Sequence, residues 1–194
     1  MKYLIITGSP KQDGLCRSIT NEIAKGAADG GAQVAIQNTA GIESCRCCND
    51  GWGSCGTEHE CAFGEGSFNK AQENIRNADM ICIITPVYWG ESAEGLKSLM
   101  DRVRRCESVV KKDGALRVTN MNEGKQILLV AVPGGSGGGA LSCLGQMERF
   151  CHHTGAVIFD FINVNRWNSD YKKIAAYSAA KAMAEGRKAG ITVN

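Results

Sequence analysis

The sequence predicts an α/β fold, with a parallel sheet covered by helices on both faces. Three short apolar runs, rich in β-branched residues, are typical of strands buried on both sides, and two weaker runs bring the number of expected strands to five. Helical stretches separate these runs, and the right-handed crossovers that such alternation requires give an open parallel sheet. The chain has 194 residues, of which 43% are hydrophobic. This is enough for one sizeable core, so we expect one domain over residues 1–194.

The expected strands cover residues 2–7, 33–37, 79–85, 126–132 and 157–164. The expected helices cover residues 16–29, 67–77, 93–109, 140–153 and 170–188. In open parallel sheets, ligands bind outside the carboxyl ends of the strands, where the strand order reverses. A site is therefore expected in the loops that follow the first, third and fourth strands.

Charge and hydropathy point to small-molecule chemistry. The 22 Lys and Arg residues nearly balance the 20 Asp and Glu residues, and a net charge of +2 gives no reason to expect nucleic acid or an anionic membrane. The apolar run at residues 1–7 ends at Gly8-Ser9-Pro10, too early for a signal peptide. No stretch approaches the ~18 apolar residues needed to span a bilayer. We expect a cytoplasmic protein.

The loop after the first strand, residues 8–18, is a small polar turn that leads directly into a helix. The free amides and positive dipole end of that helix attract an anion, so the loop suits a phosphate group. The hydroxyls of Ser9 and Ser18 and the charge of Lys11 or Arg17 can complete its shell. The alternative is an ordinary tight turn with a helix cap.

The loop after the third strand, residues 86–91, contains two large aromatic residues, Tyr88 and Trp89. Exposing such rings costs ~2 kcal/mol each, so they are expected to pack against something flat, and an isoalloxazine ring is one candidate. The alternative is a dimer contact or a helix edge.

The loop after the fourth strand, residues 133–139, is almost without side chains. Glycine costs conformational entropy there, which is explained if the backbone approaches a ligand closely or adopts positive φ. The alternative is a flexible lid. Three such loops at three strand ends are more specific than any one of them, and together they favour FMN.

Four segments carry a resemblance to a known group: Gly8-Ser9-Pro10-Lys11, the Thr-Pro-Val-Tyr-Trp-Gly run at residues 85–90, Leu96-Lys97 with Asp101-Arg102, and residues 134–139. The chain resembles the NAD(P)H-dependent FMN reductase and iron-sulfur flavoprotein group of the flavodoxin-like superfamily. The resemblance covers most of the chain. It implies a three-layer sandwich with a five-stranded parallel sheet in the order 2-1-3-4-5.

The resemblance also implies that FMN binds noncovalently. It gives phosphate roles to Ser9, Lys11, Cys16, Arg17 and Ser18. It gives ring contacts to Pro86, Val87, Tyr88, Trp89, Gly134, Gly135, Ser136 and Gly137. Where the group often has Asn-Thr, this chain has Leu15-Cys16, so a hydroxyl contact to phosphate is replaced or lost and weaker FMN binding is expected. A homodimer or homotetramer is expected by the same analogy.

Five of the ten cysteines lie within residues 45–61, near the end of the sheet that carries the FMN loops. A [4Fe-4S] cluster is one explanation, because iron-sulfur flavoproteins carry a compact cysteine set at this point in the chain. The candidate metal ligands are Cys45, Cys48, Cys55 and Cys61, with Cys47 as a substitute. Zinc on the same thiols, with His59, is a second explanation. A loop of free or redox-active thiols is the third.

We therefore expect an FMN-dependent oxidoreductase in which NAD(P)H gives hydride to the flavin N5, so that no side chain is needed as a catalytic acid or base. The expected acceptors are a quinone, a flavin, a nitro compound or a metal ion. One alternative is an iron-sulfur electron carrier that uses ferredoxin as partner. Another is a noncatalytic binding module that has lost the flavin.

Overall fold

The computed structural model describes residues 1–48, 53–63, 66–110, 116–118, 121–135 and 137–188. The prediction for Ser136 lies outside these residues. Five parallel strands form the main sheet in the order β2-β1-β3-β7-β8, which is the predicted order 2-1-3-4-5 for the five long strands. These strands are β1 (Lys2–Thr7), β2 (Gln33–Asn38), β3 (Met80–Tyr88), β7 (Gln126–Pro133) and β8 (Val157–Asn163).

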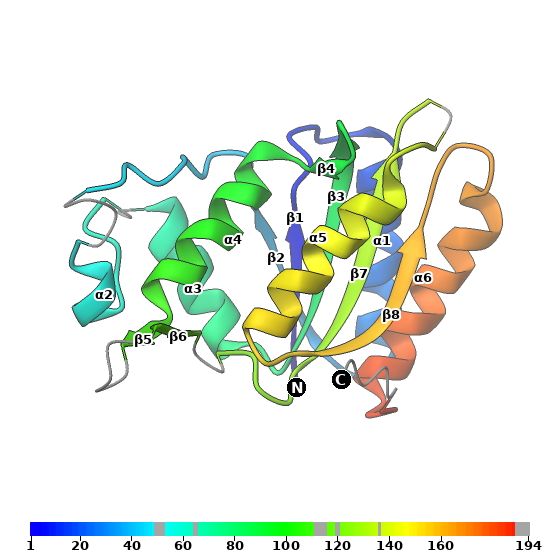
Figure 1. Ribbon diagram of the computed structural model, residues 1–194. Helices are drawn as coiled ribbons and strands as arrows, with labels where there is room; N and C mark the ends of the chain where they lie inside the picture. The colour runs from blue at the N-terminus through cyan, green and yellow to red at the C-terminus, as the bar shows by residue number, and fades with distance from the viewer. Residues whose placement is uncertain (49–52, 64–65, 111–115, 119–120, 136, 189–194) are drawn as a thin grey trace.

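Helices cover both faces of the sheet and give three layers (Figure 1). One face packs against α1 (Gly14–Asp29) and α6 (Ser169–Ala184), and the other against α3 (Ser67–Asn77), α4 (Glu94–Cys106) and α5 (Ala140–His153). The alternation of apolar side chains along β1 explains the two cores. Leu4 and Ile6 point to the α3–α5 side, whereas Tyr3 and Ile5 point to the α1–α6 side.

Strand β3 is longer than predicted, because Pro86, Val87 and Tyr88 continue it instead of forming a loop. The pairing explains how a proline is accommodated. Strand β1 pairs with β3 only as far as Ile84, so Pro86 lies beyond its reach and has no hydrogen bond to lose on that side. Beyond this point β3 pairs with β7 and with a two-residue antiparallel strand, β4 (Glu91–Ser92), which is the sixth strand of the sheet.

Three further elements were not predicted. The one-turn helix α2 (Cys55–Glu58) lies within the cysteine-rich segment, and the short strands β5 (Ser108–Val110) and β6 (Leu116–Val118) form a separate antiparallel ribbon. The β-branched pair Val109-Val110 favours strand over helix, so α4 ends at Cys106 and not at Val109. None of the helices in the described residues is both long enough and apolar enough to cross a membrane.

Candidate FMN site and the cysteine pocket

A single open cleft lies at the carboxyl ends of β1, β3 and β7. The three predicted loops meet there, although they are far apart in the sequence. The cleft is lined by Ser9, Lys11, Asp13, Gly14, Leu15, Cys16, Pro86, Val87, Tyr88, Val132, Pro133, Gly134, Gly135 and Arg166. Eight of the predicted flavin contacts are therefore brought together: Ser9, Lys11, Cys16, Pro86, Val87, Tyr88, Gly134 and Gly135.

The loop after β1 is held to its neighbours by main-chain hydrogen bonds. The Gly8 amide donates to the Ile84 carbonyl oxygen over 2.8 Å, which ties the loop to β3. A Cβ on Gly8 would lie 2.7 Å from the Thr85 Oγ1, so this position requires glycine. The Ser9 hydroxyl accepts a hydrogen bond from the Lys11 amide over 3.3 Å, which closes the turn ahead of α1.

Helix α1 begins directly at the cleft, so its free amides are available to an anion. Asp13 is its N-cap residue but makes no side-chain cap hydrogen bond. Cys16 is buried in the first turn. Burial raises the pKa of the Cys16 thiol to about 11, against a smaller lowering by its hydrogen bond with Ser9. Cys16 is therefore a neutral thiol at pH 7 and adds no negative charge beside a bound phosphate.

The other end of the cleft has an apolar wall on one side and bare backbone on the other. Pro86, Val87 and the half-exposed Tyr88 come from the end of β3, and Gly134 and Gly135 follow β7. A Cβ on either glycine would meet no atom within 4 Å, so their backbone faces open space. A flat ring can approach such a surface closely, and the residues present fit a flavin.

Four predicted contacts do not line the cleft. Trp89 is fully exposed at φ +53° in the tight turn between β3 and β4, and it does not line the cleft. Arg17 is exposed on α1, and Ser18 is half-buried one residue further along that helix. Gly137 lies at φ +84°, and a Cβ there would lie 2.8 Å from the Asn165 side-chain nitrogen.

Arg166 also lines the cleft, but no sequence motif predicted it as a site residue. It lies in the loop after β8, at the far edge of the sheet from β2. Because β8 pairs in parallel with β7, this loop follows the same edge of the sheet as the cleft, and α6 packs beside α1 (Figure 1).

Comparisons with known proteins assign the family. The model of the NADPH-dependent FMN reductase family matches residues 1–169. The chain belongs to this family. It is accordingly an FMN-dependent oxidoreductase with a flavodoxin-like fold, as the sequence resemblance predicted.

Solved structures agree with the fold of this FMN reductase family member. An apo NADH:FMN oxidoreductase has a TM-score of 0.63 at 15% identity and covers 98% of this chain and 91% of its own. A putative quinone reductase from Klebsiella pneumoniae has a TM-score of 0.64 at 17% identity, and the match covers 93% of this chain and 82% of the reductase. An archaeal flavodoxin has a TM-score of 0.62 at 10% identity, and the match covers 96% of this chain and 99% of the flavodoxin. No curated protein matches the chain by sequence.

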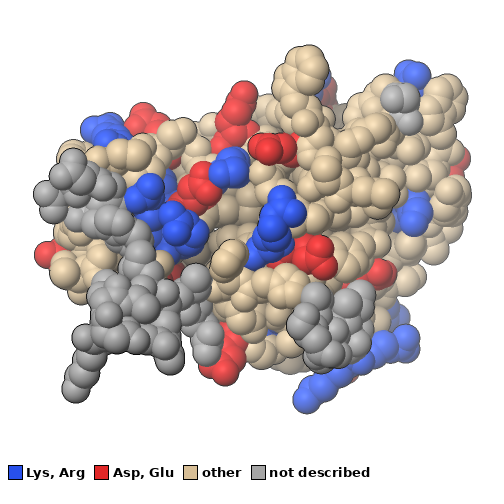
Figure 2. All heavy atoms as spheres, viewed as in Figure 1, with Lys and Arg blue, Asp and Glu red and all other residues tan. Residues whose placement is uncertain are grey.

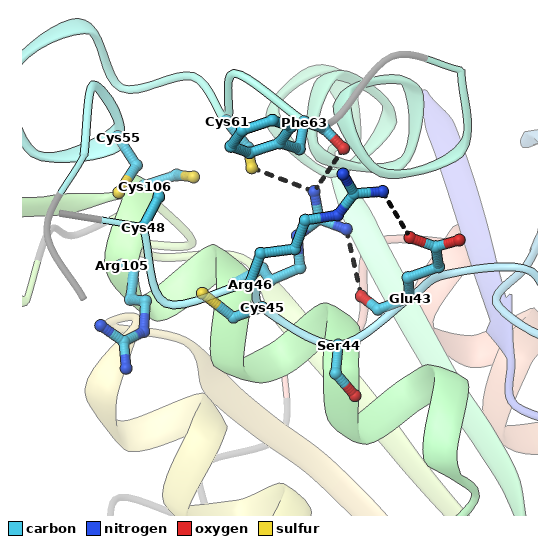
Figure 3. Close-up of a pocket in the computed structure, with 11 residues that line it drawn as sticks. Glu43, Ser44, Cys45, Arg46, Cys48, Cys55, Cys61, Phe63, Arg105 and Cys106 are labelled. Carbon is cyan, nitrogen blue, oxygen red and sulfur yellow. Dashed lines mark hydrogen bonds and ion pairs between the residues drawn. The ribbon is translucent and has the colours of Figure 1, made fainter. Parts of the chain in front are cut away.

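The cysteine-rich segment forms a second pocket that shares no lining residue with the cleft. Five thiols line it: Cys45, Cys48, Cys55, Cys61 and Cys106. Figure 3 shows them between α2, α4 and the segment around Glu43. Cys106 comes from the end of α4 and was not among the predicted ligands, whereas the predicted substitute Cys47 is exposed and does not line the pocket.

Arginines surround these thiols. Arg102 is buried and donates from Nη2 to the Cys61 Sγ over 3.0 Å and from Nη1 to the Glu43 carbonyl oxygen over 3.1 Å. Its guanidinium lies 4.1 Å from the centre of the Phe68 ring. Figure 2 shows basic side chains gathered over the α4 side of the molecule, with acidic ones among them.

The predicted metal ligands do not form a preassembled site. Within the described ranges, no group of three or more His, Cys, Asp or Glu side chains could hold a metal ion. His59, the proposed extra zinc ligand, does not line the pocket, and its Nδ1 is hydrogen-bonded to the Cys106 carbonyl oxygen over 2.8 Å. Burial and the neighbouring thiols Cys55 and Cys61 raise the pKa of Cys106 to about 12, so it is a neutral thiol.

Proposed function

We propose that the cleft at the ends of β1, β3 and β7 binds FMN, and that the protein passes electrons from NADPH through it to a small acceptor. One observation carries this proposal: an anion-binding helix start, an apolar wall and a side-chain-free loop line the same cleft. FMN needs all three, because it joins a phosphate to a flat tricyclic ring.

The phosphate end of the ligand is assigned to the loop after β1 and the start of α1. Ser9 contributes a hydroxyl, Lys11 a positive charge, and the first turn of α1 its free amides. The neutral thiol of Cys16 is a weak donor in place of a hydroxyl, so the phosphate is held less tightly than a serine or threonine would hold it.

The ring end is assigned to Pro86, Val87 and Tyr88 on one side and Gly134 and Gly135 on the other. These residues orient the ring and exclude water from the face they cover. When bound, FMN accepts two electrons from a nicotinamide and can pass them on singly or as a pair. The cleft remains open to solvent at its mouth, which suits a small flat acceptor such as a quinone, a nitro compound or a second flavin.

Steady-state oxidation of NADPH by FMN-loaded protein, followed with and without a simple quinone, tests this proposal. Quinone-dependent turnover that disappears from flavin-free protein is expected. Protein that holds FMN but leaves NADPH unoxidised with every acceptor class would contradict the enzymatic proposal.

An iron-sulfur electron carrier is the second candidate function, favoured by the five thiols that line one pocket. The thiols would have to move together to bind a cluster or zinc. Iron, sulfide and zinc analysis of anaerobically purified protein tests this candidate.

Counting the reactive thiols is a second test. Of the ten free cysteines, four are exposed or half-buried: Cys45, Cys47, Cys48 and Cys61. Metal-free native protein should therefore show four fast-reacting thiols, and a bound metal would protect most of them.

We also propose a homodimer or homotetramer in the cytoplasm. Two exposed apolar side chains, Trp89 and Leu141, support an oligomer, because an interface would bury them. Both lie where the β3–β4 turn meets the start of α5. The Ser142 hydroxyl donates to the Gly90 carbonyl oxygen over 2.7 Å at this contact. Light scattering at several protein concentrations measures the assembly.

A further inference from the structure

The side chains of the loop after β1 give the cleft no net positive charge. Among the lining residues, only Lys11, Asp13 and Arg166 carry full charges. The positive charge of Lys11 and the negative charge of Asp13 cancel, because the two residues lie two positions apart in the same loop. Without Arg166 the cleft would offer a phosphate no net positive charge from its side chains. Arg17, the other basic residue near this loop, is exposed and does not line the cleft.

A hydrogen-bonded turn holds the backbone at Arg166 in place. The Asn165 Oδ1 accepts hydrogen bonds from the amides of Trp167 (2.9 Å) and Asn168 (3.1 Å). The Asn168 Oδ1 accepts one from the Asn165 amide over 2.8 Å. The turn also packs against the glycine loop, since a Cβ on Gly137 would lie 2.8 Å from the Asn165 side chain. The fold therefore fixes the backbone position of Arg166.

The guanidinium of Arg166 is free for a ligand. It stacks 4.5 Å from the centre of the Trp167 ring, and no ion pair joins it to a carboxylate within the part of the chain that the structure describes. Stacking fixes the plane of a guanidinium and leaves its N–H groups available, and these groups match the oxygens of a phosphate.

We propose that Arg166 binds a phosphate monoester in this cleft, namely the 5′-phosphate of FMN. The inference rests on the proposed function. The position of Arg166 indicates an anionic ligand. Arg166 shares the cleft with residues 13–16 at the start of α1, where the free main-chain amides also favour an anion. From the loop after β8, Arg166 supplies the net positive charge that remains after Lys11 and Asp13 cancel, and so compensates for the hydroxyl missing at Cys16.

The 2′-phosphate of NADPH is another monoester that an arginine at the cleft could bind, and the experiment separates the two sources. The variants are Arg166→Met, which removes the charge, Arg166→Lys, which keeps it, and Arg104→Met as a matched control on the exposed face of α4. Flavin fluorescence titration measures the dissociation constants of FMN and riboflavin for each. The Michaelis constants for NADPH and NADH are measured on FMN-saturated protein.

We expect Arg166→Met to weaken FMN binding about tenfold or more and to leave riboflavin binding unchanged. Arg166→Lys should recover part of the loss, and Arg104→Met should match the native protein. The salt dependence of FMN binding should be shallower in Arg166→Met. Equal FMN binding by native protein and Arg166→Met would overturn the inference, and so would a loss confined to NADPH relative to NADH. If native protein binds no FMN at all, the proposed function itself fails.

Discussion

The side-chain amide of Asn38 donates a hydrogen bond to the main-chain carbonyl oxygen of Ser9 over 2.9 Å. The same side chain accepts one from the Ala40 amide over 2.7 Å. The end of β2 is thereby tied to the loop that meets the phosphate, although Asn38 does not line the cleft itself. Asn38 is thus a positioning residue for that loop.

Replacing Asn38 with alanine should therefore weaken FMN binding by about three- to tenfold, since each lost hydrogen bond contributes ~1 kcal/mol. Asn74→Ala is the control, because Asn74 also makes a side-chain hydrogen bond to the β2 region, to Gln37 over 2.9 Å, away from the cleft. Fluorescence titration and thermal melting of both variants provide the comparison. Equal effects of the two changes on FMN affinity would show that Asn38 contributes only to stability.

Lys11 and Arg17 were both predicted as phosphate ligands, but only Lys11 lines the cleft. Lys11→Met should weaken FMN binding about tenfold through loss of a charge-assisted contact. Arg17→Met should change it by less than about twofold, because an exposed charge outside the cleft is screened by solvent. Titrations with FMN at low salt measure both, and the reverse ranking would show that the phosphate lies outside this cleft.

The Cys16 thiol predicts how FMN binding depends on pH. Burial raises the pKa of this thiol to about 11 from its ordinary value of 9.0, so the thiolate forms only as the pH approaches 11. A thiolate would repel the phosphate, and its absence predicts a constant dissociation constant for FMN between about pH 7.5 and 9.5. Binding that weakens steadily across that range in native protein, but not in Cys16→Ser, would show that the thiol ionises normally.

Two glycines near the cleft should respond differently to alanine. Gly139 lies at φ +79°, and a Cβ there would lie 2.7 Å from the Gly90 Cα, so Gly139→Ala should cost at least ~1–2 kcal/mol and lower the melting temperature by several degrees. Gly134 faces open space without positive φ, so Gly134→Ala should preserve the melting temperature and weaken FMN binding by narrowing the cleft. Calorimetry and FMN titration separate the two effects.

The sequence predicted the main sheet well because β1, β3 and β7 are short apolar runs, and the alternation of strands with helices places the weaker runs of β2 and β8. It misplaced the end of β3, since a Pro-Val-Tyr run is typical of a loop, and only the short reach of β1 lets Pro86 remain in a strand. The ribbon of β5 and β6 has no strong alternation to predict it.

The candidate site was predictable where loops follow strands directly, as at Ser9 and Gly134. Arg166 was not, because one arginine in a polar loop carries no pattern, and its place depends on the parallel pairing of β8 with β7 and on α6 packing beside α1. A Cβ on Gly26 would lie 2.2 Å from the Tyr177 carbonyl oxygen, so these helices approach each other closely. The cysteines were predicted near the FMN loops, but their pocket lies towards the end of α4.

We propose that the loops after β1, β3 and β7 together form one FMN site. Titration of flavin-stripped protein with FMN, followed by the absorbance of the ~450 nm flavin band after gel filtration, tests it most directly. We predict that each chain retains one FMN, and that NADPH bleaches the band under anaerobic conditions. Folded protein that retains no FMN after saturation would contradict the account.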